Sequence, residues 1–316
     1  MTASVTVAVV GAADVAKELG KKGTASDLTL FNAVHDEHAM TLVEPTNFPE
    51  KLAPLVQALA MGDRCLLVVR ELTKPLAETI AVVDLSPVPT TVVLGPTVGE
   101  SEVTRLLKGS HLEAAPRVPL DFPKLRELVA GWTAPAADGP VEVPLDHAFP
   151  VKGVGAVALG VVRRGTLTAH ERLRLYPTEK EVEVRSIQVH DIDRKDAQVG
   201  ERVGVSLKGV DADELSRGQT LAPAGSLLAG PSVDGGPLER CRYYRGDAGP
   251  GAQLHLALGL QVVPAVLDRA DASGVGVTAD RPVVGRAGGP ALLLDLSVPA
   301  GPRIVGRFAV TGVRGG

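Results

Sequence analysis

The spacing of apolar residues along the first 139 positions alternates between two patterns. Short runs of consecutive apolar residues predict buried strands at Val5–Gly11, Cys65–Val69 and Thr90–Leu94. Between these runs, apolar residues recur every three or four positions, which is typical of helices that bury one face. The predicted helices are Val15–Leu19, Lys51–Ala60, Ala77–Leu85, Ser101–Lys108 and Pro123–Trp132. Strands that alternate with helices predict an α/β domain with an open parallel sheet covered on both faces.

The pattern changes after the proline-rich stretch Thr133–Pro140, which is typical of a linker. Apolar and polar residues then alternate in short segments separated by Gly, Pro and charged turns, which predicts small antiparallel barrels. The segments of the first barrel are Val151–Arg163, Thr166–Tyr176, Glu181–His190 and Arg202–Leu207. Those of the second barrel are Leu238–Tyr244, Ala252–Leu260, Ala291–Val298 and Arg303–Thr311. We therefore predict three domains, with boundaries at 1–139, 140–225 and 226–316.

Composition adds limits on where the protein works. With 45% apolar and 22% charged residues, the chain has the make-up of an ordinary globular protein. It begins with no leader pattern, and no apolar run approaches the roughly 18 residues that span a bilayer, so we expect no membrane association. Cys65 and Cys241 lie far apart and form no CxxC pair, which favours a reduced, cytoplasmic setting.

Charge is distributed unevenly along the chain. Residues 1–139 carry 12 Lys and Arg against 17 Asp and Glu, whereas residues 226–316 carry 9 against 7, and all 9 bases there are Arg. The overall net charge of −4 argues against non-specific coating of nucleic acid, and we expect no DNA partner. Arginine is the better phosphate and stacking partner, so the last segment remains compatible with RNA contact.

Four glycine-containing strings stand in order in the second segment. They are LDHAFPVKGVG at 145–155, LGVVRRGT at 159–166, AQVGERVGV at 197–205 and LSRGQ at 215–219. Their glycines suit turns with positive φ or a close approach of two strands. This series resembles the start of the second domain of SelB-type elongation factors, where D-x-x-F-x-x-K-G-x-G leads into a glycine-rich hairpin.

The resemblance implies an EF-Tu-like architecture, a GTPase-like α/β domain followed by two antiparallel barrels. It also implies tRNA, the ribosome or another translation factor as partners and a monomeric protein. The stretch Leu19–Asn32 and the start Asp146–Phe149 are similar to an archaeal SelB-like subgroup that includes a factor once proposed to serve pyrrolysine decoding.

The nucleotide motifs of that family are degenerate in this chain. A GTPase cradles the phosphates with G-x-x-x-x-G-K-[ST] after the first strand. One register places Gly11, Asp14 and Lys17 at matching positions, but Ala16 replaces the second glycine and Glu18 replaces the hydroxyl ligand of magnesium. An equally defensible alignment deletes part of the loop. Glu18 could in principle hold magnesium, but it would also face phosphate oxygens of like charge.

The other two GTPase elements are altered as well. Where the family has D-x-P-G-H, the chain has EPTNF at 44–48, so Glu44 replaces the aspartate and Phe48 the histidine that orients water. Where the family reads guanine with N-K-x-D, the chain has GPTV at 95–98, without a carboxylate. We therefore predict a pseudo-GTPase with no catalytic residue, and expect GTP and magnesium as cofactors only if weak binding survives.

Two functions from different classes remain open. In the first, the protein binds tRNA or a partner in the translation machinery without a cycle of GTP hydrolysis. In the second, it is a divergent SelB-type GTPase that delivers a special aminoacyl-tRNA to the ribosome, which the position of Lys17 favours. A regulator that mimics part of the translation machinery is a third reading.

The resemblance also implies RNA-binding residues. Asp146, His147, Phe149, Arg185 and His190 match the pocket that receives the aminoacyl end of tRNA. The alternative is that Phe149 belongs to the barrel core and that Asp146 caps a turn. In the last segment Arg240, Arg242, Arg245 and Arg307 are candidates for contacts with the tRNA backbone, although an ordinary solvated surface would also place arginines there.

One histidine-rich stretch has spacing that could suit a metal. His35, Asp36, Glu37 and His38 follow one another in an acidic stretch, and nothing else in the sequence supplies further ligands. We predict a solvated loop there and no metal site.

Overall fold

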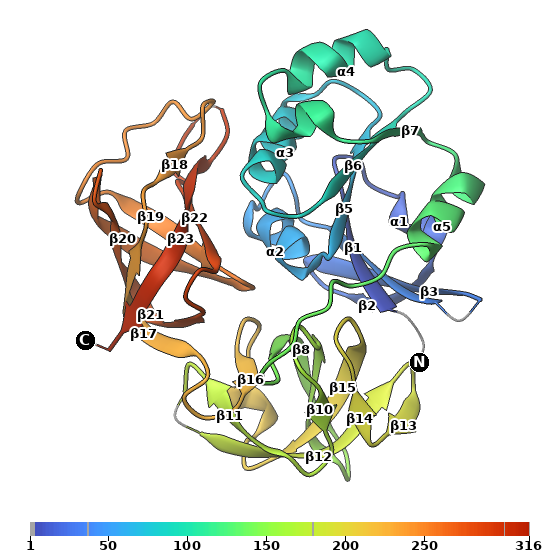
Figure 1. Cartoon of the computed structure of the whole chain (residues 1–316), viewed down its shortest axis with the longest axis vertical. Helices are drawn as coiled ribbons and strands as arrows, with labels where there is room; N and C mark the ends of the chain where they lie inside the picture. The colour runs from blue at the N-terminus through green and yellow to red at the C-terminus, as the bar shows by residue number, and fades with distance from the viewer. Residues whose placement is uncertain (1–3, 37, 179, 300, 316) are drawn as a thin grey trace. The chain divides into compact units, whose positions relative to one another are not determined.

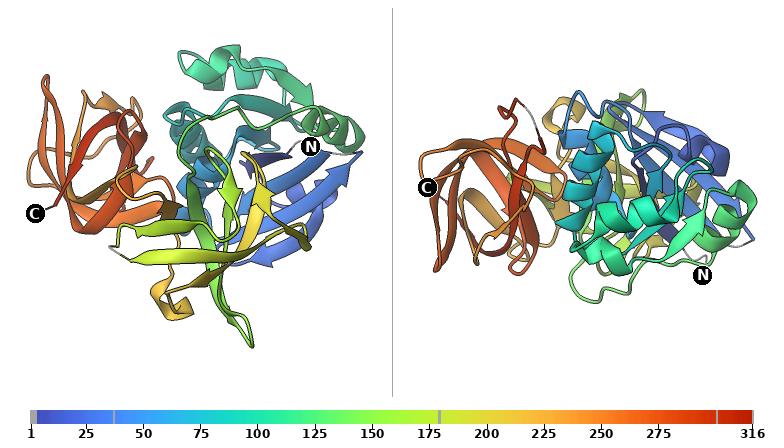
Figure 2. Two further views of the ribbon diagram at one scale, coloured as in Figure 1. Left: turned by 60° about the horizontal axis from the view of Figure 1, so that its bottom comes forward. Right: turned by 90° about the horizontal axis from the view of Figure 1, so that it is seen from above.

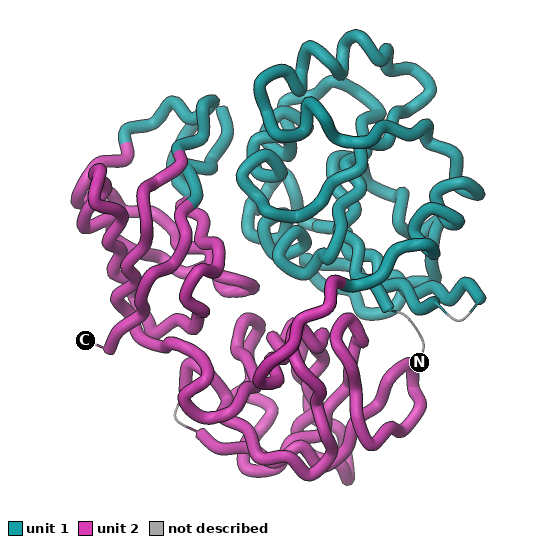
Figure 3. The backbone as a smooth tube through the Cα atoms, viewed as in Figure 1, with its two compact units in different colours: residues 1–134, 240–247, 294–307 teal, residues 135–239, 248–293, 308–316 magenta. Residues whose placement is uncertain are grey.

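The computed structural model describes residues 4–36, 38–178, 180–299 and 301–315. Its contacts divide the chain into two compact units (Figure 3). Unit 1 comprises residues 1–134, 240–247 and 294–307, and unit 2 comprises residues 135–239, 248–293 and 308–316. None of the described helices is long and apolar enough to cross a membrane.

The first part of the chain forms an α/β domain around a seven-stranded sheet (Figure 1). Along the sheet the strands follow the order β2-β3-β4-β1-β5-β6-β7. Their bounds are β1 (Ser4–Val10), β2 (Lys21–Ala25), β3 (Leu28–His35), β4 (His38–Pro45), β5 (Arg64–Val69), β6 (Thr90–Leu94) and β7 (Arg117–Pro119). The helices are α1 (Ala16–Leu19), α2 (Ala53–Met61), α3 (Lys74–Asp84), α4 (Glu100–Leu107) and α5 (Phe122–Ala130), with a 3-10 turn η1 (His111–Ala114).

The prediction of an α/β domain is confirmed, but the sheet is mixed rather than parallel throughout. Strands β4, β1, β5, β6 and β7 run parallel, whereas β2, β3 and β4 form consecutive antiparallel hairpins. Helix α1 ends after four residues because Gly20 adopts an extended conformation and leads directly into β2. Sequence analysis assigned no strand to residues 21–45, where three strands are found.

Local sequence explains the longer helices. Thr73 accepts a hydrogen bond from the Leu76 amide and begins α3, with Pro75 in the first turn. Asp121 does the same for α5 through the Lys124 amide. Figure 1 shows α2 and α3 on one side of the sheet and α1 and α5 on the other. All seven residues of β1 are buried, as expected for the central strand.

The second part of the chain forms the first predicted barrel. Its strands pair in the order β11-β16-β8-β9-β15-β12-β13, and pairing of β11 with β12 closes the ring. The left view of Figure 2 shows these strands curling around a common core, which is made mainly of Val, Leu and Ala. The strands are β8 (Val143–Val151), β9 (Gly155–Val161), β10 (Leu167–Thr168), β11 (Arg172–Tyr176), β12 (Glu181–Val189), β13 (Ile192–Arg194), β14 (Asp196–Ala197), β15 (Arg202–Lys208) and β16 (Thr220–Ala222), with a 3-10 turn η2 (Ala212–Glu214).

The last part forms a second barrel. Its strands pair in the order β17-β21-β20-β19-β22-β23-β18, closed by pairing of β17 with β23. At the closure Gly235 leaves room for the Phe308 ring, which a Cβ atom would strike. The strands are β17 (Leu228–Gly235), β18 (Glu239–Arg240), β19 (Gln253–Leu258), β20 (Gln261–Asp271), β21 (Gly274–Gly285), β22 (Pro290–Leu294) and β23 (Ile304–Arg314). The prediction of a second barrel is confirmed, although β17, β20 and β21 were not predicted as strands.

Candidate functional site

The loop after β1 and the helix α1 that follows it contain three of the residues predicted for the nucleotide site. Gly11 has a φ of +93°, and a Cβ atom there would come within 2.5 Å of the Val68 carbonyl oxygen, so only glycine fits. Asp14 takes the left-handed conformation with a φ of +67°. The ammonium of Lys17 lies 3.0 Å from the Asp14 carboxylate, with both side chains at least half exposed. Lys17, in the first turn of α1, therefore pairs with a residue of the loop that precedes this helix.

Glu44, the fourth residue, binds the backbone amides of this loop. It lies at the end of β4, and its Oε1 accepts hydrogen bonds from the amides of Val15 and Ala16 at 2.9 and 2.7 Å. Burial raises the pKa of the Glu44 carboxyl above its usual range, although the amides of residues 14–16 oppose the shift. In a phosphate-binding loop such amides point at the ligand. Here the Glu44 carboxylate accepts hydrogen bonds from these amides instead.

Glu18, the fifth residue, lies one position beyond Lys17 in α1. Its side chain is exposed, and its backbone carbonyl accepts a hydrogen bond from Arg126 of α5. The five residues predicted for a degenerate nucleotide site lie in the loop after β1, in α1 and near the end of β4, and their part in nucleotide binding stays a prediction. The bonds made by Glu44 were not predicted. The signal was that β4 runs parallel to β1, so that the carboxyl ends of both strands meet at one edge of the sheet.

A pocket of about 340 Å³ lies at the carboxyl ends of β6 and β7. Arg117 of β7 lies there, 3.8 Å from the Glu100 carboxylate and 2.6 Å from the Thr104 hydroxyl. Sequence analysis considered residues 95–98 at this edge and did not identify Glu100 or Arg117. The pocket is lined by Leu94, Gly95, Pro96, Glu100, Arg117, Val118, Pro119 and Leu120.

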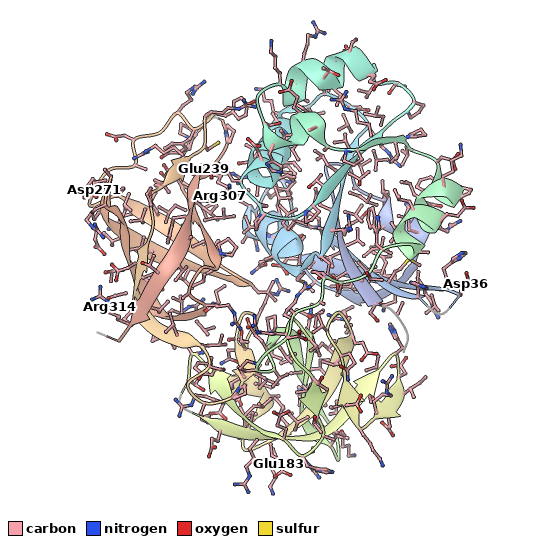
Figure 4. The ribbon with its side chains drawn as sticks, in the orientation of Figure 1. Asp36, Glu183, Glu239, Asp271, Arg307 and Arg314 are labelled. Atoms are coloured by element: carbon pink, nitrogen blue, oxygen red, sulfur yellow. The ribbon has the colours of Figure 1, made fainter. Side chains whose placement is uncertain are left out.

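The histidine-rich stretch lies in the β3–β4 hairpin. His35 of β3 pairs with His38 of β4, and Figure 4 shows Asp36 at the tip. The His35 Nε2 atom is 3.9 Å from the Asp36 carboxylate. Glu37 is outside the described residues. Among the residues that the structure describes, no three His, Cys, Asp or Glu side chains are grouped so as to hold a metal ion.

In the first barrel Asp146 is buried and held by neighbours. Arg202 of β15 donates two hydrogen bonds to its carboxylate, at 2.5 and 2.8 Å, and His147 Nδ1 lies 2.7 Å from Oδ1. Burial opposes ionisation, but Arg202 and His147 outweigh it and hold the pKa of Asp146 below its usual range. Asp146 thus joins β8 to β15, with His147 beside it at 17% side-chain exposure.

The other three residues of the predicted aminoacyl pocket are exposed. Phe149 is 40% exposed and is therefore not a core residue. Arg185 of β12 donates to the Val154 carbonyl at 3.2 Å, in the turn between β8 and β9. His190 stands in the hairpin turn after β12 with a φ of +50°. Of these five residues, Asp146 and His147 are in direct contact, and a shared pocket for all five stays a prediction.

The four predicted backbone-contacting arginines have different surroundings. Arg242 lies 4.5 Å from the Tyr243 ring centre, and Arg245 donates to the Arg242 carbonyl at 3.0 Å. Arg240 lies in β18 and Arg307 in β23, where Figure 4 marks it.

Two of these arginines, Arg242 and Arg307, lie near an ion pair of the α/β domain. The His111 Nδ1 atom is 3.0 Å from the Asp84 carboxylate. This hydrogen bond raises the pKa of His111 in spite of burial and of the nearby Arg307 charge. Burial opposes ionisation of Asp84, but His111 and Arg242 hold the pKa of Asp84 below its usual range. Arg242 and Arg307 therefore face protein charges as well as solvent.

Comparisons with known proteins agree with the fold of this chain. The family model for elongation factor Tu domain 2 matches residues 155–222. The chain is 33% identical to the uncharacterized protein MJ0325 of Methanocaldococcus jannaschii, over 89% of this chain and 91% of that protein. It is 27% identical to the selenocysteine-specific elongation factor of the same organism, over 83% of this chain and 61% of that factor.

A solved structure has the same fold. The translation elongation factor SelB of Methanococcus maripaludis, in complex with the GTP analogue GppNHp, matches 99% of this chain and 80% of its own with a TM-score of 0.84 and 21% identity. The apo form of that factor matches with a TM-score of 0.81.

Proposed function

Because the chain belongs to the SelB-like group of EF-Tu-type translation elongation factors, we propose that it binds tRNA or another part of the translation machinery without a cycle of GTP hydrolysis. The proposal includes the three predicted domains, 1–139, 140–225 and 226–316. The position of Glu44 on the loop after β1 is the observation that carries it.

A phosphate could reach the amides of Val15 and Ala16 only by displacing the Glu44 carboxylate. Two like unit charges about 4 Å apart repel by about 4 kcal/mol at the effective dielectric near a protein surface. A nucleotide would have to overcome this repulsion or protonate Glu44. Either requirement would weaken the amide contacts that normally give a phosphate loop its affinity.

Lys17 offers little compensation. A phosphate-loop lysine contributes through its positive charge, but the Lys17 ammonium already lies 3.0 Å from Asp14. Breaking that exposed pair costs little by itself. The carboxylate of Asp14 would nevertheless remain beside the incoming phosphate, so the loop as a whole presents two acidic side chains to an anion.

The RNA-binding part of the proposal rests on the first barrel. Phe149 and Arg185 are exposed there, and an aromatic ring and a guanidinium are the groups on which an unpaired base can stack. The relative that is 27% identical over 83% of this chain is a selenocysteine-specific elongation factor. The proposal does not name the tRNA.

Titration of the purified protein with labelled GTP and GDP in the presence of magnesium tests the absence of a GTP cycle. We expect no saturable binding up to about 1 mM nucleotide. A dissociation constant of about 1 mM corresponds to a binding free energy of about −4 kcal/mol. Lys17→Ala is the matched variant, since Lys17 has the position of the family's phosphate lysine. Micromolar binding that is lost in Lys17→Ala would contradict the proposal and favour the divergent SelB-type GTPase that delivers a special aminoacyl-tRNA.

A gel-shift titration with total aminoacylated tRNA tests the binding function separately. Measurements start at low salt, because phosphate contacts weaken steeply as salt rises. Phe149→Ala and Arg185→Ala should each weaken the shift, whereas Arg281→Ala, an exposed arginine of β21, should not. If the wild-type protein gives no shift at low salt, the tRNA form of the proposal is wrong.

A further inference from the structure

We infer that residues 44–50 are held in one conformation by two ties made by the chain's own side chains, whether or not a nucleotide is present. This segment contains the EPTNF string that stands where the family has D-x-P-G-H. One tie holds its beginning and the other its end. Both ties lie within the α/β domain and residues 294–307 of unit 1 and involve none of the residues predicted to bind RNA.

The first tie is the pair of hydrogen bonds from the amides of Val15 and Ala16 to Glu44. It joins the carboxyl end of β4 to the loop that follows β1. Bonds from backbone amides to a charged oxygen are stronger than bonds between neutral groups. The partly buried position of Glu44 limits competition from water. The beginning of the segment is therefore fixed at the place where a ligand's phosphate would otherwise make the connection.

The second tie is made by Arg303, which precedes β23. Its Nε and Nη2 atoms donate to the two oxygens of Glu78 in α3, at 2.9 and 2.7 Å, and its own amide donates to Glu78 Oε1 at 2.8 Å. Glu78 is 8% exposed. Such a two-pronged pair is geometrically specific, and a lysine cannot reproduce it.

Arg303 also reaches the end of the segment directly. Its Nη2 atom donates to the Pro49 carbonyl at 2.8 Å, and Nη1 lies 3.4 Å from the Glu50 carbonyl. The same guanidinium thus connects α3, the end of the 44–50 segment and residues 294–307, all within unit 1. These charges can be buried because each has a partner of opposite sign.

Together the ties remove the two ways in which a nucleotide could move the segment. A ligand can shift a conformational equilibrium only by binding one state better than the other. The beginning of the segment already has an anion of its own, and the end is held by an arginine that no ligand needs to position. We therefore expect residues 44–50 and 294–307 to respond to disruption of the ties and not to nucleotide.

Hydrogen–deuterium exchange on the full chain tests this inference, because each tie has its own reporter amides. The amides of Val15 and Ala16 report on Glu44, and the amide of Arg303 reports on Glu78. Exchange is followed in buffer with magnesium, with GDP and with a non-hydrolysable GTP analogue. The variants are Glu44→Ala, Glu78→Ala and Arg303→Lys, with Arg281→Lys as the matched control on an exposed arginine of β21.

We expect exchange to accelerate by about tenfold or more at the amides of Val15 and Ala16 in Glu44→Ala and at the amide of Arg303 in Glu78→Ala, the factor that corresponds to loss of a charge-assisted hydrogen bond. Arg303→Lys should also speed exchange at the Lys51 amide, which bonds to the Asn47 carbonyl. Core amides of β5 and β6 should exchange as slowly as in the wild type, which shows that each variant is folded. Arg281→Lys should change none of these rates.

Two results would overturn the inference. One is a wild-type protein in which nucleotide changes exchange at residues 44–50 or 294–307 by more than about threefold, because local opening would then be ligand-dependent. The other is a folded set of variants in which the reporters exchange at wild-type rates. Hydrolysis of GTP without any change at the reporters would contradict the proposed lack of a GTP cycle and leave the two ties supported, so the two failures are distinguishable.

Discussion

The guanidinium of Arg202 holds the buried carboxylate of Asp146 by two hydrogen bonds, at 2.5 and 2.8 Å. Asp146 follows Leu145 in β8, and Arg202 begins β15, two strands that each pair with β9 in the first barrel. The side chain of Asp146 is 1% exposed and that of Arg202 is 11% exposed. Because both side chains are shielded from water, removal of one partner leaves the other charge buried without a counter-charge.

We therefore expect Arg202→Ala to lower the free energy of unfolding by about 3–5 kcal/mol, the usual cost of leaving a buried charge without its partner. Urea denaturation followed by circular dichroism measures the change. Arg172→Ala, at an exposed position of β11, should stay within about 0.5 kcal/mol of the wild type. Equal effects of the two substitutions would show that the Arg202 pair does not support the barrel.

The same pair predicts a dependence of stability on pH. The folded pKa of Asp146 lies below its usual value, so its ionised form stabilises the fold above the unfolded pKa of about 3.9. That contribution should be lost as pH falls below about 4 through the folded pKa. Denaturation curves of the wild type and Asp146→Asn should therefore converge at acid pH. A stability difference that stays constant from neutral to acid pH would contradict this account.

Glu44 predicts a dependence of the opposite sign. Burial raises its folded pKa above the unfolded value of about 4.3, so the folded state binds the proton more tightly. Stability contributed by protonation should be present below about pH 4 and lost as pH rises through the folded pKa. Glu44→Gln keeps an oxygen that can accept from the loop amides and removes the titration. A flat profile in that variant over this window, compared with a sloping wild-type profile, is the expected result.

Removing the carboxylate altogether has a different consequence. Glu44→Ala leaves the amides of Val15 and Ala16 without their acceptor, much like loss of a helix cap, which costs about 1 kcal/mol. Thermal unfolding should show this loss of stability. Glu18→Ala, in helix α1, is the control because the Glu18 side chain is exposed. If both variants unfold at the wild-type temperature, the Glu44 contacts do not contribute to stability.

His111 should titrate above an ordinary histidine. The hydrogen bond to Asp84 raises its folded pKa, so the charged pair contributes below the unfolded pKa of about 6.5 and is lost as pH rises through the folded value. Nuclear magnetic resonance of the ring protons gives the pKa directly. Asp84→Asn should bring it down towards about 6.5, whereas Asp121→Asn, at the residue that caps the N-terminus of α5, should leave it unchanged. A wild-type value at or below 6.5 would exclude the pair as a stabilising contact.

Domain order and the class of each fold followed from the sequence because the apolar period changes from helical to alternating at the linker. The strands β17, β20 and β21 were missed because Gly and Pro interrupt their alternation, as in the run GPSVDGG at 230–236. Barrel closure overrides these weak local signals, since each strand is fixed by pairing with partners distant in the sequence.

The sequence nominates candidate site residues but does not predict the partners that their side chains contact. Glu44 was identified as a substitution, whereas its bonds to Val15 and Ala16 arise only when the ends of β4 and β1 meet. Asp146 was expected in a binding pocket or as a turn cap, yet its carboxylate is held by an arginine 56 positions away. No periodic pattern encodes such a long-range ion pair. The assignment of Asp146 to the aminoacyl pocket stays a prediction.

The edge position of β2 affects the tendency of the protein to associate with itself. An edge strand exposes unpaired backbone groups that can recruit a strand from another molecule. Lys21 and Lys22 stand exposed on this strand. Their charges repel a second copy that approaches in the same register, and a buried lysine would be costly in any such pairing. The four-residue helix α1 thus leads into an edge strand that begins with two exposed lysines, and their charges discourage self-association.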